Sequence, residues 1–234
     1  MKYFLTSHIS EENEMCLNIK NGFTDKLKEA LGSKPINCLC ISSSPADIKS
    51  SEYYGNLDKK KFENSGIAFS EYHIIHNGSY KNFDKLFVNA DMIFLAGGHV
   101  PTQNKFLHKL NLRPKLEKFN GVVVGLSAGS MNSAELVYAV PEVDGEAKDA
   151  KYERFLEGLG LTYKMMVPHY YEGMEEETLD GLNIFEDIMI PDSKRREFYI
   201  FPDGTYIYGD GKVEEIYGAY KLIENGRLQE NFLL

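Results

Sequence analysis

Residues 121–138 read GVVVGLSAGSMNSAELVY, and this stretch combines an apolar run, a glycine-rich turn and a helix-like pattern. The turn, residues 125–129, has the form G-x-S-x-G. Glycines on both sides of a serine permit the sharp strand-to-helix turn known as a nucleophile elbow. We therefore predict a strand over residues 121–126, a nucleophile at Ser127 and a helix over residues 130–138. The alternative is a tight turn capped by a serine without a chemical role.

Apolar segments and helical patterns alternate along the rest of the chain. Strands are predicted for KYFLTS (2–7), INCLCIS (36–42), AFSEYHII (68–75), MIFLAGG (92–98), GVVVGL (121–126) and MMVPHY (165–170). Helices are predicted within residues 11–31, 45–65, 102–110 and 175–189. All-apolar central strands that alternate with helices indicate a parallel sheet covered on both faces. We therefore expect an α/β fold with a doubly wound, mostly parallel sheet.

The pattern changes after residue 196. Short strands are expected in EFYIF (197–201), TYIYG (205–209), KVEEIY (212–217) and AYKLIENGRL (219–228). Asn225-Gly226 in the last segment is a strong hairpin signal. No linker or repeat interrupts the chain, so residues 1–234 are expected to form a single domain.

Composition narrows the possible partners and compartment. The 234 residues carry a net charge of −9. No long basic stretch appears, and we interpret Lys59-Lys60-Lys61 as a solvated helix face, so nucleic acid and anionic membranes are not expected as partners. Three cysteines without an export signal suggest reduced thiols and a cytoplasmic protein. Cys38 and Cys40 lie on one face of a predicted strand, where they are core residues rather than metal ligands, and we expect neither a metal nor a cofactor.

Reactive residues follow the predicted parallel strands at their carboxyl ends, where open α/β sheets place their ligands. These residues are Ser7, His8, Ser42 to Ser44, His76, Gly97, Gly98, His99, Ser127 and His169. A pocket at that edge would collect them. A serine nucleophile needs a base. His169 is the only histidine after Ser127 and is the favoured base, with His99 as a weaker rival.

A catalytic histidine also needs an acidic partner, and a developing oxyanion needs backbone donors. Asp203, at the end of another predicted strand, is the favoured acid, although Pro-Asp-Gly is also an ordinary turn sequence. Glu142 and Asp144 are alternatives. The oxyanion donors are expected to be the N–H of Ala128 and that of Gly97 or Gly98.

Four segments in this order resemble one known family of enzymes. They are FLAGGHVPTQNKFLHKL (94–110), GLSAGSMNSA (125–134), VPHY (167–170) and FPDGTY (201–206). Together they look like the aspartyl dipeptidase (peptidase E) and cyanophycinase family of serine peptidases, and the similarity extends over nearly the whole chain. The resemblance implies a doubly wound sheet related to class I glutamine amidotransferases.

By the same resemblance, Ser127 matches the nucleophile, His169 the base and Asp203 the acid. Family members often carry glutamate at the acid position. Two pocket positions also depart from the family pattern. His99 stands where an amide or carboxylate is usual, and Leu179 lies near the place of the arginine that selects an N-terminal aspartate. The resemblance therefore implies peptidase chemistry without the aspartyl preference.

We accordingly expect a serine peptidase that hydrolyses small peptides, dipeptides among them, and that is a monomer or a homodimer. Two alternatives use the same fold. One is an esterase or other acyl hydrolase with the same elbow, and the other is a binding protein that has lost turnover.

Overall fold

The structure is a computed structural model that describes residues 1–11 and 14–229. Its larger sheet has seven strands in the order β13-β12-β1-β5-β4-β2-β3. The strands are β13 (Glu214–Tyr217), β12 (Tyr206–Gly209), β1 (Lys2–Thr6), β5 (Val122–Leu126), β4 (Met92–Leu95), β2 (Ile36–Ile41) and β3 (Phe69–Ile75). The five strands from β1 to β3 in this order are parallel, and β12 and β13 extend the sheet with antiparallel pairings. The predicted α/β fold with a mostly parallel sheet is confirmed.

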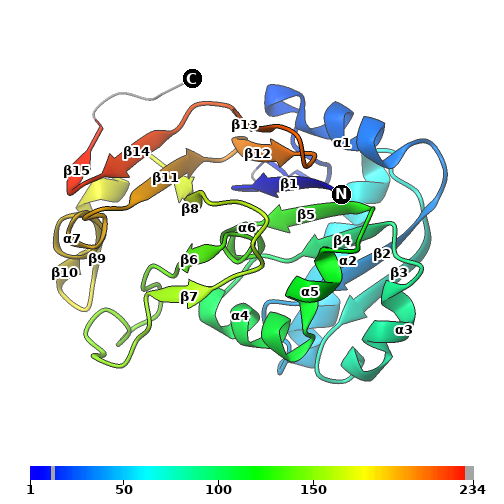
Figure 1. The fold of residues 1–234 in the computed structure, drawn as a ribbon, viewed down its shortest axis with the longest axis horizontal. Coiled ribbons are helices and arrows are strands. Elements are labelled where there is room, and N and C mark those ends of the chain that lie inside the picture. Colours follow the sequence, from blue (N-terminus) through cyan, green and yellow to red (C-terminus); the bar gives the residue numbers. More distant parts are fainter. Residues whose placement is uncertain (12–13, 230–234) are drawn as a thin grey trace.

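Helices cover both faces of this sheet because its strands are apolar on both sides. Phe4 and Phe94 pack with α1 (Phe23–Leu31) and α2 (Ile48–Asn64) on one face. Leu5 and neighbouring alternate residues pack on the other face against α3, α4 and α5. These three helices are α3 (Phe83–Phe87), α4 (Val100–Lys109) and α5 (Leu112–Leu116). The chain thus winds in one direction from β1 to β3 and returns through β4 to β5, which places β1 and β5 side by side (Figure 1).

A second sheet of four strands lies beside the first, on the left in Figure 1. It consists of β15 (Arg227–Leu228), β14 (Lys221–Glu224), β11 (Glu197–Pro202) and β8 (Met165–Tyr170). The strand predicted at 165–170 therefore exists, but it pairs with β11 and not with the main sheet. Its apolar side chains Met165 and Val167 bury themselves in a separate core with Phe198 and Ile200. The predicted hairpin at Asn225-Gly226 joins β14 to β15.

Two predicted helices are largely wrong. The helix after the elbow, α6, spans only Ala128–Met131, and Leu136–Tyr138 forms strand β6 against β7 (Phe155–Glu157). Val137 and Tyr138 are fully buried there, and such β-branched and aromatic residues favour a half-buried strand.

Residues 175–189 likewise form mostly other elements. They contain a short 3-10 turn (Met174–Glu176), a hairpin of β9 (Thr178–Leu179) and β10 (Leu182–Asn183), and a π-helix (Ile184–Met189) that leads into α7 (Ile190–Asp192). Asp180 and Gly181 at the hairpin both have positive φ. Asp-Gly favours a tight hairpin turn, and here that preference outweighs the helical spacing of the neighbouring apolar residues.

Of the other predicted helices, the first begins later than expected, whereas α2 and α4 lie close to their predicted ranges. Helix α1 begins at Phe23 after a 3-10 turn (Lys20–Gly22), and residues 12–13 of the prediction lie outside the described residues. A further 3-10 turn, Tyr80–Asn82, precedes α3. Cys38 and Cys40 are buried in the core, as predicted.

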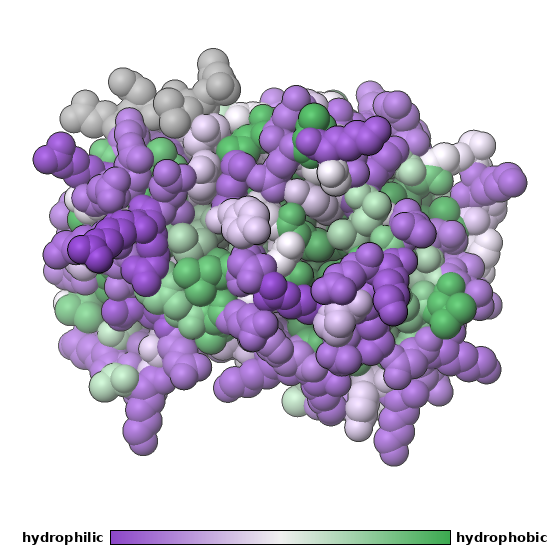
Figure 2. Space-filling view, in the orientation of Figure 1, coloured by the Kyte–Doolittle hydropathy of each residue, from purple (hydrophilic) through white to green (hydrophobic). Residues whose placement is uncertain are grey.

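The face drawn in Figure 2 is mostly hydrophilic, with separate apolar areas. Within residues 1–11 and 14–229, the structure has no helix with the length and apolar character that crossing a bilayer requires.

Candidate active site

The elbow at Ser127 is sterically strained. Ser127 has φ 49° and ψ −112°, a conformation that residues with a side chain rarely adopt. A Cβ at Gly125 would lie 2.8 Å from the backbone nitrogen of Ser130, and one at Gly129 would lie 2.2 Å from the carbonyl oxygen of Leu95. Both glycines are therefore required for the close approach of α6 to the sheet, as the motif predicts.

Strand β1 holds the elbow in this conformation. The Thr6 carbonyl accepts hydrogen bonds from the Ser127 N–H (3.0 Å) and from Ser130 Oγ (2.8 Å). The Thr6 hydroxyl in turn donates to the Gly125 carbonyl at 2.8 Å. Because strain persists only where surrounding contacts over-determine it, these three bonds explain how the turn remains sharp.

His169 and Asp203 form a pair at the ends of β8 and β11. Nδ1 of His169 donates to Oδ1 of Asp203 at 2.9 Å. Burial alone would raise the pKa of Asp203, but the hydrogen bonds from His169 and Ser7 outweigh it and hold this pKa below its usual value. Asp203, rather than Glu142 or Asp144, is thus the carboxylate that contacts His169.

Ser7 is a member of this cluster that the sequence pattern did not assign. Its fully buried hydroxyl donates to Asp203 Oδ1 at 2.7 Å and accepts from the backbone N–H of His169 at 2.8 Å. His169 itself has φ 63°. The Ser7 side chain at the end of β1 therefore hydrogen-bonds to both residues of the His–Asp pair. Its position directly after a central strand was the only signal in the sequence.

Two cavities meet at Ser127, His169 and Glu142, which line both. The larger has a volume of about 560 Å³ and the smaller about 350 Å³. Volumes of this size are typical of small-molecule sites. No hydrogen bond joins the Ser127 hydroxyl to His169 among the described contacts. With Nδ1 bonded to Asp203, Nε2 is the nitrogen of His169 that remains to act on a hydroxyl.

The larger cavity extends from the elbow towards α2. Gly97 and Gly98 line it beside Ser127, as do His8 and residues 42–44. Gly98 has φ 138°, and a Cβ there would lie 2.3 Å from Ser43 Oγ, so only glycine fits. Ala128 is fully buried at the first position of α6, where its N–H has no acceptor within the helix.

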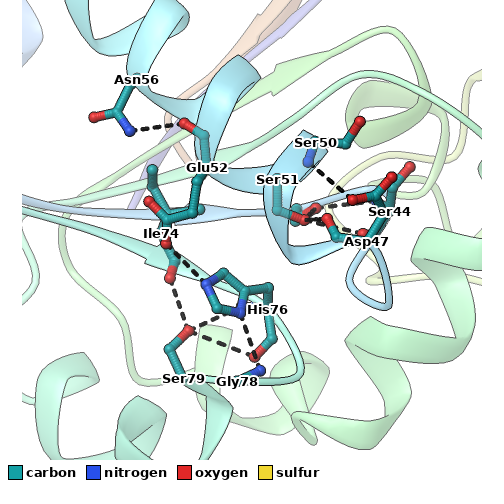
Figure 3. Close-up of polar contacts among 11 residues, drawn as sticks. Ser44, Asp47, Ser50, Ser51, Glu52, Asn56, Ile74, His76, Gly78 and Ser79 are labelled. Atoms are coloured by element: carbon teal, nitrogen blue, oxygen red, sulfur yellow. Dashed lines mark hydrogen bonds and ion pairs between the residues drawn. The ribbon is translucent and has the colours of Figure 1, made fainter.

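Not every strand-end residue reaches this cavity. His76 is held by Glu52, whose carboxylate lies 2.8 Å from Nε2, and Gly78 N–H donates to Nδ1 at 3.0 Å (Figure 3). The same view shows Ser51 of α2 donating to the carbonyls of Ser44 and Asp47. These contacts fix the first turn of α2 against the loop after β2, and so fix one wall of the larger cavity.

His99, expected at the substrate pocket, lies outside the lining of both cavities. Its ring is held by the Thr102 hydroxyl at 2.7 Å and by the Glu146 carboxylate at 2.8 Å. Leu179 lines the smaller cavity. Glu142 lines both cavities. Burial raises its pKa above the usual glutamate value, although the nearby His99 acts in the opposite direction.

The sequence profile of peptidase family S51 matches residues 37–216, which include the elbow and both residues of the His–Asp pair. The chain belongs to peptidase family S51. It is a serine-type peptidase and therefore a hydrolase.

Solved structures agree with this peptidase in fold. A peptidase from an acI-B1 Actinobacterium has a TM-score of 0.65 and 15% sequence identity, with 99% of this chain and 96% of that chain covered. A putative peptidase E protein from Listeria monocytogenes EGD-e has a TM-score of 0.63 and 17% identity, with 92% and 96% covered. Comparison with curated proteins gives no match.

Proposed function

We propose that this S51 peptidase hydrolyses short peptides, dipeptides among them, with Ser127 as nucleophile, His169 as base and Asp203 as the acid that orients the base. One observation carries the proposal. The strained elbow places Ser127 in the same cavity wall as a histidine whose far nitrogen is already bonded to a carboxylate. That arrangement supplies the three roles of a serine triad.

The roles follow from the chemistry of each group. Nε2 of His169 removes the proton from the Ser127 hydroxyl while its oxygen attacks the peptide carbonyl carbon. The same proton passes to the leaving amine as the C–N bond breaks, which leaves an acyl-enzyme. Water then adds with His169 again as base, and the acid product departs. Asp203 stabilises the imidazolium that forms in each step.

The oxyanion of each tetrahedral intermediate needs two aligned N–H donors. Ala128 supplies the donor next to the nucleophile, and Gly97 or Gly98 supplies the second. A Cβ at Gly97 would lie 3.4 Å from the Cβ of Ser127, which supports this assignment because it shows how close the glycine backbone is to the nucleophile.

The smaller cavity suits an uncharged or basic N-terminal residue. Its walls are largely apolar, with Leu179 among them, and they carry the carboxylates of Glu142 and Glu177. Within the described residues its lining includes no lysine or arginine, and Arg196 instead stacks on the ring of Phe155 at 4.1 Å. A substrate ammonium would be stabilised beside Glu142, whereas an aspartyl side chain would lack a bidentate partner.

A library of dipeptides and tripeptides with product detection by mass spectrometry tests the proposal. We expect Ala-Leu, Asn-Leu and Lys-Leu to be cleaved at least as well as Asp-Leu. A preference for Asp-Leu over Asn-Leu above about tenfold, or 1.4 kcal/mol, would contradict the assigned specificity. Turnover of p-nitrophenyl esters without turnover of any peptide would instead identify an acyl hydrolase.

A further inference from the structure

The larger cavity contains a charged pair that the proposed triad does not use. Lys61 and Asp58, on the inward face of α2, both line the cavity, and their side chains are only 12% and 9% exposed. Lys61 therefore departs from the solvated face expected for the run Lys59-Lys60-Lys61, whereas Lys60 is exposed.

The contact with Asp58 does not occupy all the N–H donors of the Lys61 ammonium. The Lys61 ammonium lies 3.5 Å from the Asp58 carboxylate, too far for a short charge-assisted bond. An ammonium has three donors, and one such contact occupies at most one of them. Burial raises the pKa of Asp58 to about 6 in spite of Lys61, which shows that the two charges compensate each other incompletely.

The placement of the acyl side in the smaller cavity decides which end of a peptide Lys61 meets. The amine that leaves must lie beside His169, since that residue protonates it. His8 lies edge-on to His169 with ring centroids 5.8 Å apart, and His8 and Lys61 line the same cavity. The acyl side of the substrate occupies the smaller cavity in the proposed function, so the leaving residue extends into the larger one.

Five serines, residues 42–44, 50 and 51, line the same cavity as Lys61. Within the described residues, Lys61 is the only lysine or arginine in this lining. The same lining also carries the carboxylates of Asp58 and Glu142, so in this protein of net charge −9 the Lys61 ammonium and the hydroxyl groups beside it are the part of the cavity suited to one small anion. A free carboxylate is the anion that every dipeptide carries on its leaving residue.

We propose that Lys61 binds the C-terminal carboxylate of a dipeptide substrate and thereby makes this enzyme selective for peptides whose leaving group is a free amino acid. The inference rests on the proposed peptidase function. It assigns the larger cavity to the leaving residue and gives α2 a part in specificity.

The test compares Ala-Leu with Ala-Leu amide, which lacks the carboxylate charge. The wild-type enzyme is expected to give a kcat/KM at least about tenfold higher for the free dipeptide, as a charge-assisted contact provides. Lys61→Met should bring this ratio close to one. Lys60→Met, which removes an equal charge from the exposed side of α2, should leave the ratio at the wild-type value.

The outcomes separate the inference from the proposed function. Equal turnover of the two substrates by the wild type, or an unchanged ratio in Lys61→Met, overturns the carboxylate site and leaves the peptidase function intact. Failure of the wild type to cleave either substrate overturns both. If Lys61→Met cleaves neither, Asp58→Asn decides: it removes the partner of Lys61 and must raise the ratio, and an unchanged ratio there refutes the inference.

Discussion

Replacing Ser7 by alanine should impair both folding stability and catalysis. The substitution removes the donor to Asp203 Oδ1 and leaves the backbone N–H of His169 without its acceptor. A buried donor left unsatisfied costs about 1–3 kcal/mol. For a chain of 234 residues that corresponds to a decrease in Tm of roughly 2–6 °C.

The catalytic effect of Ser7→Ala has a separate origin. Without this hydroxyl, His169 loses the contact that fixes its positive-φ backbone, and Asp203 loses a donor that lowers its pKa. We expect kcat to fall about tenfold or more, equivalent to about 1.4 kcal/mol, with a smaller change in KM. Steady-state kinetics on a cleaved dipeptide and a thermal unfolding curve measure the two effects.

Ser193→Ala is the matched control for this experiment. Ser193 is also fully buried, donates to the Ile190 carbonyl at 2.8 Å and accepts from Gly226 N–H at 2.9 Å, outside both cavities. It should lower Tm by a similar amount and leave kcat at the wild-type level. If Ser7→Ala matches this control in both measurements, Ser7 has only a structural role and the reasoning about His169 is refuted.

Three further substitutions test other parts of the account. Asp203→Asn should lower kcat by about 10⁴ as in other serine triads, whereas Glu142→Gln should not, and a reversed order in kinetic assays would make Glu142 the triad acid. Leu179→Arg should raise kcat/KM for Asp-Leu relative to Asn-Leu by about tenfold or more, because it adds a bidentate partner to the smaller cavity; an unchanged ratio would show that residue 179 does not meet the substrate. Asp58 keeps its proton up to about pH 6 in the folded state and to about pH 4 when unfolded, so this group reduces stability as the pH rises through that window. Denaturant unfolding from pH 4 to 7 should therefore show the free energy of unfolding of the wild type falling relative to that of Asp58→Asn as the pH rises. A constant difference between the two proteins over this range would contradict the raised pKa of Asp58.

The sequence predicts the parts of the site that depend on local geometry. Gly125, Gly129 and the valine run define a turn that needs no long-range information, and the structure has that turn. Apolar strands with no polar face likewise predict the parallel sheet. The positions of His169 and Asp203 at strand ends, together with the family resemblance, predict that the two residues pair, and their side chains form a hydrogen bond.

The remaining features depend on which strands become neighbours. Strand β8 pairs with β11 in a separate sheet, and no pattern within residues 165–170 distinguishes that partner from the main sheet. The role of Ser7 arises only because β1 ends beside β8 and β11. Lys61 looks like its neighbours in a charged run, and only the packing of α2 against β2 and β3 turns its side chain inward.

Labelling with a fluorophosphonate probe tests the identity of the nucleophile most directly. The peptidase should gain one adduct, mapped by mass spectrometry to Ser127, and the adduct should be lost in Ser127→Ala. His169→Ala should label much more slowly, because the hydroxyl then lacks its base. An adduct on another residue, or a Ser127→Ala enzyme that cleaves dipeptides at the wild-type rate, would contradict the account.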